Sequence, residues 1–235
     1  MGIISGPAIE LHGATPYTFR AVQSVATDSI FKFHDTLTSR AEISDLSAKF
    51  KDDVIAVIGL GGTGAHVLDF LVKTPVREIR AFDPDLFHVH TAFRSPGRLE
   101  PAELGQLKAE VYQKRYDNFR HGLSIQPTFI DASSSPEIEG VTFAFVCVDK
   151  GSSRAGIFEL LIANNIPFID VGMGLRRTED GSLNGQMRTT YYSIEEAAAL
   201  RDRQLAPLTD APDDIYRVNI QISELNAFNL SLIHI

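Results

Sequence analysis

The chain has 235 residues, of which 44% are hydrophobic and 22% charged, values that are ordinary for a soluble globular protein with one sizeable core. Its net charge of −8 argues against a nucleic-acid-binding surface, which needs clustered lysine and arginine. The sequence has no apolar run of membrane-spanning length and a single cysteine, which excludes an internal disulfide. We therefore expect a reduced, cytoplasmic protein with no nucleic-acid or membrane partner.

The first fifty residues form an N-terminal segment with few clear patterns. Residues 3–11 are compatible with an edge strand. After Ser39, a plausible N-cap, the apolar residues Ile43, Leu46 and Phe50 recur at helical spacing and predict a short helix.

The stretch VIAVIGLGGTG at residues 54–64 is the strongest local pattern in the chain. A short apolar, β-branched run predicts a strand buried on both faces, and a helical pattern over residues 65–73 follows the glycines. Glycine allows a sharp turn and the close approach of a phosphate, which the start of the next helix attracts. The residues assigned to this turn are Gly59, Gly61, Gly62 and Gly64. The stretch predicts a nucleotide-binding domain, over residues 51–229.

Strand and helix patterns alternate through the rest of the domain. Pro101 is expected to begin a long amphipathic helix with Leu104, Leu107, Val111 and Phe119 along one side. Further strands are predicted at residues 78–82, 124–130, 141–148 and 167–171, an antiparallel or edge strand at 186–193, and helices at 155–164 and 195–203. The alternation predicts an α/β fold with a doubly wound, mostly parallel, Rossmann-like sheet and helices on both faces.

Three acidic residues, Asp83, Asp85 and Asp149, come directly after predicted strands. Because parallel strands end at one edge of the sheet, we expect these carboxylates to line the same crevice as the glycine turn. Asp83 is placed to bind a ribose, and Asp149 to hold magnesium, which prefers carboxylate and phosphate oxygens. Arg94 and Lys108 supply positive charge for phosphates from the segment after the second strand.

Simpler interpretations exist for several of these residues. His88 and His90 have a spacing found at metal sites, but an ordinary loop pair is the favoured interpretation. Cys147 lies in an apolar strand and is expected to be a buried thiol without special reactivity. Asp149 would also suit the N-cap of a helix over residues 151–164.

Five motifs occur in a specific order: GLGGTG, DPDLFHVHTAFRS, GQLKAE, VCVDKGSSR and IPFIDVGMG. In this order they resemble the ThiF/MoeB/HesA family, which includes the adenylating domains of ubiquitin-like-protein activating enzymes. The resemblance spans about residues 53–229. It implies an enzyme that uses ATP and magnesium to adenylate the C-terminal carboxylate of a ubiquitin-like or sulfur-carrier protein ending in glycine. It also implies a homodimer.

The resemblance implies a role for each matching residue. The four glycines form the nucleotide turn, Asp83 binds the ribose with Asp85 beside it, and Asp149 is the catalytic acid that organises magnesium. Arg94 and Lys108 contact the phosphates. Arg154 supports the nucleotide site, and Arg40 is a candidate to reach the site of a neighbouring subunit.

The sequence departs from the family pattern at several points. Thr91 and Ser95 stand where the family usually has asparagine and glutamine, so triphosphate positioning is in question. The zinc-binding cysteine pairs of many members are absent, and no cysteine follows Cys147 to form a thioester. Two alternatives remain open: an NAD(P)-dependent oxidoreductase domain, and a catalytically silent nucleotide-binding subunit that stabilises a partner.

The last residues, 230–235, suggest a non-native tail. One back-translation of LSLIHI resembles the end of a transposon adapter used to fragment DNA for sequencing. We therefore expect the natural chain to continue differently after about Asn229.

Overall fold

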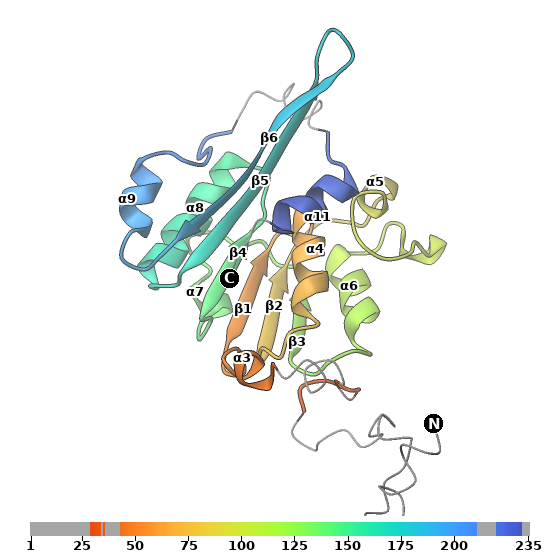
Figure 1. The fold of residues 1–235 in the computed structure, drawn as a ribbon, viewed down its shortest axis with the longest axis vertical. Helices are drawn as coiled ribbons and strands as arrows, with labels where there is room; N and C mark the ends of the chain where they lie inside the picture. Colours follow the sequence, from red (N-terminus) through yellow and green to blue (C-terminus); the bar gives the residue numbers. More distant parts are fainter. Residues whose placement is uncertain (1–28, 34, 36–42, 211–219, 232–235) are drawn as a thin grey trace, which may run out of the picture.

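The computed structural model describes residues 29–33, 35, 43–210 and 220–231. Its centre is a six-stranded sheet in the order β3-β2-β1-β4-β5-β6, in which only β6 is antiparallel to its neighbour (Figure 1). The strands are β1 Val54–Ile58, β2 Glu78–Phe82, β3 Leu123–Gln126, β4 Phe143–Val146, β5 Phe168–Arg177 and β6 Leu183–Tyr192. The predicted doubly wound, mostly parallel fold is confirmed. The expected strand at residues 3–11, Arg40 and residues 232–235 lie outside the described residues.

Helices cover both faces of the sheet (Figure 1). One face carries α4 Gly62–Leu71, α6 Lys108–Tyr116 and α11 Ser223–Ser231, and the other carries α7 Ser135–Ile138, α8 Gly151–Ala163 and α9 Ala197–Asp202. Three shorter helices, α3 Ser44–Ala48, α5 Val89–Ala92 and η1 Pro101–Glu103, lie in the connections. None of the helices among the described residues is long and apolar enough to cross a bilayer.

Strand β1 is the middle of the core because every one of its residues is buried. Ile55 and Val57 pack into the cluster beneath α4 and α6, whereas Val54, Ala56 and Ile58 pack into the cluster beneath α8. Alternation along a strand sends neighbouring side chains to opposite faces, so a continuous apolar run is needed where both faces are covered. The predicted strand and its burial are therefore confirmed.

Strands β5 and β6 continue beyond the parallel sheet as a two-stranded ribbon (Figure 1). Only Phe168, Ile169 and Asp170 of β5 pair with β4, but the pairing with β6 continues to Arg177. The strand predicted at residues 167–171 is therefore longer than expected and continues through Gly172 and Gly174, which gives the ribbon one glycine-rich wall.

The prediction of a long helix that begins at Pro101 is wrong. The segment forms the short helix η1 and then α6, and Gly105 between them has a φ of +82°. Residues 104–107 instead pair with the chain after β2: Gly105 N–H donates to Phe87 O at 2.9 Å and Phe87 N–H to Gln106 O at 2.7 Å. These bonds replace the helical ones, and Leu104 and Phe119 remain exposed. Helix α6 consequently begins at Lys108.

A buried arginine, Arg120, covers the C-terminal end of α4. Arg120 is 1% exposed and donates to the carbonyls of Leu71, Thr74, Val76 and His121. Burial lowers the pKa of its guanidinium to about 10, so it stays protonated at neutral pH. Its planar set of donors satisfies carbonyls that the end of a helix otherwise leaves unpaired.

We expect Arg120→Met to lower the free energy of unfolding by about 2–4 kcal/mol, because several buried carbonyls lose their donor while the volume is kept. Urea denaturation measures the change. Arg98→Met is the matched control, because the Arg98 side chain is 86% exposed; a comparable loss in both variants would contradict the role of Arg120.

Candidate functional site

A cavity of about 330 Å³ lies at the carboxyl ends of β1, β2 and β4. The structure brings most of the predicted site residues together there: Gly59, Gly61, Gly62, Asp83, Asp85, Arg94, Lys108 and Asp149 line it. Gly64 and Arg154 are not among the lining residues. The position agrees with the rule that open α/β sheets bind ligands beyond the ends of their parallel strands.

The glycines of the turn serve different purposes. A Cβ on Gly64 would lie 1.8 Å from Gly59 O, so this glycine allows α4 to pack against the turn itself. Gly59 has a φ of +93°, which favours glycine. A Cβ on Gly61 would meet nothing within 4 Å. Of the four, Gly61 is therefore the residue whose bare backbone faces open space in the cavity.

Asp83 is buried and ties the turn to the end of β2. Its Oδ2 accepts the Leu60 N–H at 2.6 Å, and its Oδ1 accepts the Asp85 N–H at 2.9 Å. Lys108 Nζ donates to both Asp83 oxygens at 3.2 Å and to Asp85 Oδ2 at 2.8 Å. The two acids are thus neutralised in part by a buried ammonium at the start of α6.

Arg94 lies just beyond α5, and its Nε is buried without a hydrogen-bond partner among the described residues. Its side chain lines the cavity beside Asp85 and Lys108. The backbone of Arg94 is held from α11, because Asn226 Nδ2 donates to its carbonyl at 3.2 Å. The guanidinium therefore retains donor capacity for an anionic ligand.

Asp149 is exposed and lines the cavity, and it has no hydrogen bond or ion pair within the described part of the chain. The interpretation of Asp149 as an N-cap is wrong. Lys150 occupies that position, and Asp210 binds the helix start instead, accepting Ser152 N–H at 2.9 Å and Ser152 Oγ–H at 2.7 Å. Asp149 is left with free carboxylate oxygens.

The Asp149 carboxylate suits magnesium because no cation among the described residues engages its oxygens. Mg²⁺ is commonly held by one or two carboxylates together with phosphate oxygens and water. Asp83 and Asp85 are paired with Lys108, so Asp149 is the predicted acid whose oxygens are not engaged by a cation among the described residues. No group of three or more His, Cys, Asp and Glu suited to a metal occurs within those residues. A bound nucleotide would have to supply the remaining ligands.

Arg154 is buried in a network of its own. Its Nε donates to Asp170 Oδ1 at 2.9 Å, and Arg188 Nη2 donates to Asp170 Oδ2 at 2.7 Å. Arg154 also donates to the carbonyls of Val148 and Pro207. These contacts fix the chain on either side of Asp149 and the segment before Asp210, which is the contact pattern of a supporting residue.

A second cavity, of about 680 Å³, adjoins the first. Its lining includes the glycines of the β5–β6 ribbon, Gly172, Gly174 and Gly185, together with Arg176. The two cavities share Thr63, Cys147, Val148, Asp149 and Gln221. Asp149 therefore lies at their junction.

The remaining candidates have modest roles. The rings of His88 and His90 stack with centroids 5.4 Å apart. Burial raises the pKa of the Cys147 thiol, which favours its unreactive protonated form.

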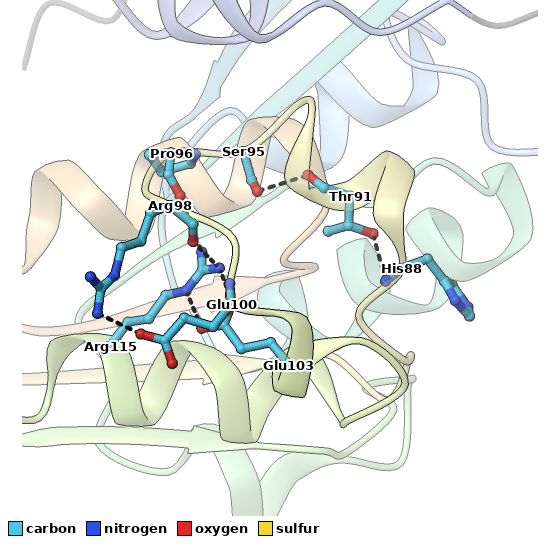
Figure 2. Close-up of polar contacts among 8 residues, drawn as sticks. All are labelled: His88, Thr91, Ser95, Pro96, Arg98, Glu100, Glu103 and Arg115. Carbon is cyan, nitrogen blue, oxygen red and sulfur yellow. Dashed lines mark hydrogen bonds and ion pairs between the residues drawn. The ribbon is translucent and has the colours of Figure 1, made fainter.

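Thr91 and Ser95, the two departures from the family pattern, are buried and turned toward their own loop. Ser95 Oγ donates to Thr91 O at 2.7 Å, and Thr91 Oγ1 accepts His88 N–H at 3.4 Å (Figure 2). Their hydroxyls thus brace the segment that leads to Arg94.

Three residues were missed by sequence reasoning: Gln221 and Phe129 line a cavity, and Asn226 holds the chain around the first cavity. Asn226 is fully buried, accepts Thr63 Oγ1–H at 2.9 Å and holds Arg94 O. Gln221 borders both cavities, and Phe129 lies at the wall of the first. The two C-terminal residues reach the turn from far along the chain, and no local pattern marks them. Phe129 follows a strand, which is a weak signal.

The fold and the cavity define a nucleotide-binding type of α/β domain, and the sequence profile of the ThiF family matches residues 35–209. Because this match covers most of the chain, the protein belongs to the ThiF family. No curated protein sequence matches the chain.

Solved structures show the same fold. E. coli TcdA, a tRNA N6-threonylcarbamoyladenosine dehydratase, aligns in complex with AMP with a TM-score of 0.53 and 23% identity over 58% of each chain. Another TcdA structure aligns with a TM-score of 0.58 and 19% identity over 82% of this chain and 87% of that one. E. coli MccB with ATP gives a TM-score of 0.52 and 17% identity over 80% of this chain and 55% of that one. The chain thus spans under two thirds of the AMP-bound TcdA and of MccB.

We expect Gly64→Ala to destabilise the protein by about 3 kcal/mol or more, because the new methyl group collides with backbone that cannot move independently. Gly61→Ala, whose methyl group enters open space, should change the free energy of unfolding by less than about 1 kcal/mol. Thermal and urea denaturation test the pair. Equal losses in the two variants would contradict the assignment of packing to Gly64 and open space to Gly61.

Proposed function

We propose that the protein is an ATP- and magnesium-dependent adenylyltransferase that activates the C-terminal carboxylate of a ubiquitin-like or sulfur-carrier protein. The observation that carries this proposal is the position of Asp149, an acid without a partner among the described residues, at the junction of two adjoining cavities. Such a junction suits a reaction in which a nucleotide and a second substrate must meet.

The first cavity suits the nucleotide. Gly61 and the start of α4 would receive phosphates, and Asp83, at the end of β2, would bind the ribose. Because Lys108 engages both Asp83 oxygens, ribose binding would release part of that contact, and the ammonium, still held by Asp85, could also contact a phosphate. The structures of TcdA with AMP and of MccB with ATP support this class of ligand.

The second cavity suits a slender acyl substrate. A Cβ on Gly174 would meet nothing within 4 Å, so the ribbon there presents bare backbone to open space. An extended glycine-ending tail would fit against such a wall. The structural neighbours are a tRNA enzyme and a protein solved with MccA. A carrier protein as substrate is therefore our proposal for this chain alone.

The chemistry would depend on position and charge. A carboxylate is already ionised at neutral pH and needs no general base to attack the α-phosphate. As its oxygen bonds to phosphorus, the bond to the leaving pyrophosphate breaks, and Arg94 and Lys108 would stabilise the charge on the phosphates. Magnesium bound by Asp149 would supply further neutralisation. The products are the acyl-adenylate and pyrophosphate.

We expect magnesium-ATP to raise the melting temperature and NAD to leave it unchanged, because a ligand that binds only the folded protein stabilises it. At a free concentration of 100 times Kd the gain is about 2.7 kcal/mol. Differential scanning fluorimetry with each ligand is the measurement. A shift with NAD alone would overturn the proposal in favour of an oxidoreductase domain.

Asp149→Asn should reduce carrier-dependent ATP–pyrophosphate exchange at least about 100-fold, since removing one charge-stabilising contact in an active site costs rate on this scale. Its thermal stability should equal that of the wild type, because the side chain is exposed and engages no partner among the described residues. Asp202→Asn, at a carboxylate that is 70% exposed, is the matched control. Undiminished exchange in Asp149→Asn would refute the role.

A further inference from the structure

The segment from His88 to Glu100, here called the Arg94 loop, contains one short helix, α5, and no sheet strand. Arg94 itself cannot fix its own side chain, because its Nε has no partner among the described residues. The direction of the guanidinium therefore depends on how firmly the backbone of this loop is held.

One side chain holds the far half of the loop. Arg115, in α6, donates through Nη1 to Pro96 O at 3.2 Å and through Nη2 to Arg98 O at 2.7 Å (Figure 2). These carbonyls lie shortly after Arg94 in the chain. Asn226 holds Arg94 O from α11. The backbone carrying Arg94 is thus fixed at the residue and just beyond it.

Arg115 is itself fixed by Glu103. Its Nε donates to Glu103 Oε1 at 3.0 Å and its Nη2 to Glu103 Oε2 at 2.7 Å, and the two side chains are only 14% and 11% exposed. Glu103 Oε2 also accepts Glu100 N–H at 3.0 Å. Such a two-point arginine–carboxylate pair sets orientation as well as distance.

Packing and charge keep this pair in place. Arg115 Cζ lies 4.9 Å from the centroid of the Phe87 ring and 5.6 Å from that of Tyr112. Burial lowers the pKa of Arg115, but the hydrogen bond with Glu103 and the charges of Glu103, Tyr112 and Tyr116 together outweigh this, and the pKa is raised. The same bond lowers the pKa of Glu103, so the pair is charged throughout the neutral range.

Arg115 shares α6 with Lys108, which contacts Asp83 and Asp85. The two residues are about two helical turns apart and so face the same side of a rigid rod. One helix therefore sets the distance between the acids at the end of β2 and the loop that carries Arg94.

We propose that Arg115 is a positioning residue for Arg94, holding the Arg94 loop so that the guanidinium faces the cavity before a nucleotide binds. The inference rests on the proposed function for the chemistry that Arg94 performs. The contact between Arg115 and the Arg94 loop is independent of the proposed function.

The test compares Arg115→Met, Arg115→Lys and Glu103→Gln with the control Arg98→Met, which keeps the carbonyl that Arg115 binds. Arg115→Met should lower kcat of ATP–pyrophosphate exchange at least tenfold and change KM for ATP less than threefold, because a misplaced catalytic group mainly costs rate. Arg115→Lys keeps the charge but cannot reach all the acceptors, so it should fall between Arg115→Met and wild type. Glu103→Gln should also lower kcat, and Arg98→Met should match wild type.

The effect should also depend on Arg94. In an Arg94→Ala background, Arg115→Met should lower the remaining rate by less than twofold, because coupled residues are non-additive. A general loss of folding would lower the rate equally in both backgrounds. Melting temperatures are measured for every variant, and Arg115→Lys serves for comparison if Arg115→Met does not fold.

Amide hydrogen exchange gives a readout that needs no activity. Amides of residues 88–100 should exchange faster in the Arg115 variants, with those of β1 and α4 unchanged. Wild-type kcat in Arg115→Met, equal losses in both backgrounds, or unchanged exchange at residues 88–100 would each overturn the inference. A wild-type protein without ATP–pyrophosphate exchange would count against the proposed function, and amide exchange would then decide by itself whether Arg115 holds the loop.

Discussion

The carboxylate of Asp83 is the interaction on which the architecture of the cavity depends. It accepts hydrogen bonds from the Leu60 N–H in the glycine turn, from the Asp85 N–H two residues further along, and from the Lys108 ammonium in α6. It thereby joins three segments that are separate in the sequence. A buried carboxylate requires this degree of pairing. The residue that we propose as the ribose ligand is therefore also the one that ties the turn, β2 and α6 together.

Charge in the cavity is arranged before any ligand is present. Asp83 and Asp85 share the ammonium of Lys108, whereas Arg94 Nε and the Asp149 carboxylate have no partner among the described residues. A cavity lined by both an arginine and an acid with such spare capacity suits a polyphosphate accompanied by a cation. Preorganisation of this kind avoids the cost of rearranging dipoles during a reaction.

Sequence reasoning succeeded where the physics is local. The apolar run of β1, the glycines and the helix after them follow from burial and backbone freedom within a few residues, and the mostly parallel sheet follows from the alternation of strand and helix patterns. The helix expected from Pro101 failed because Gly105 and pairing with Phe87 break it, a tertiary effect. Asn226 and Gln221 were unpredictable, since buried amides carry no periodicity and their partners lie far away in the chain.

Helix α11 connects the two cavities. Asn226 bonds to Thr63 at the start of α4 and to the Arg94 carbonyl. Asn229, on the same helix and also fully buried, accepts Thr189 Oγ1–H at 3.2 Å and donates to Gly172 O at 3.2 Å in the β5–β6 ribbon. Because buried amides are costly to leave unpaired, displacement of α11 would disturb both cavities at once. The walls of the two cavities are therefore mechanically connected through a helix that bonds to the glycine turn, to the Arg94 carbonyl and to the β5–β6 ribbon.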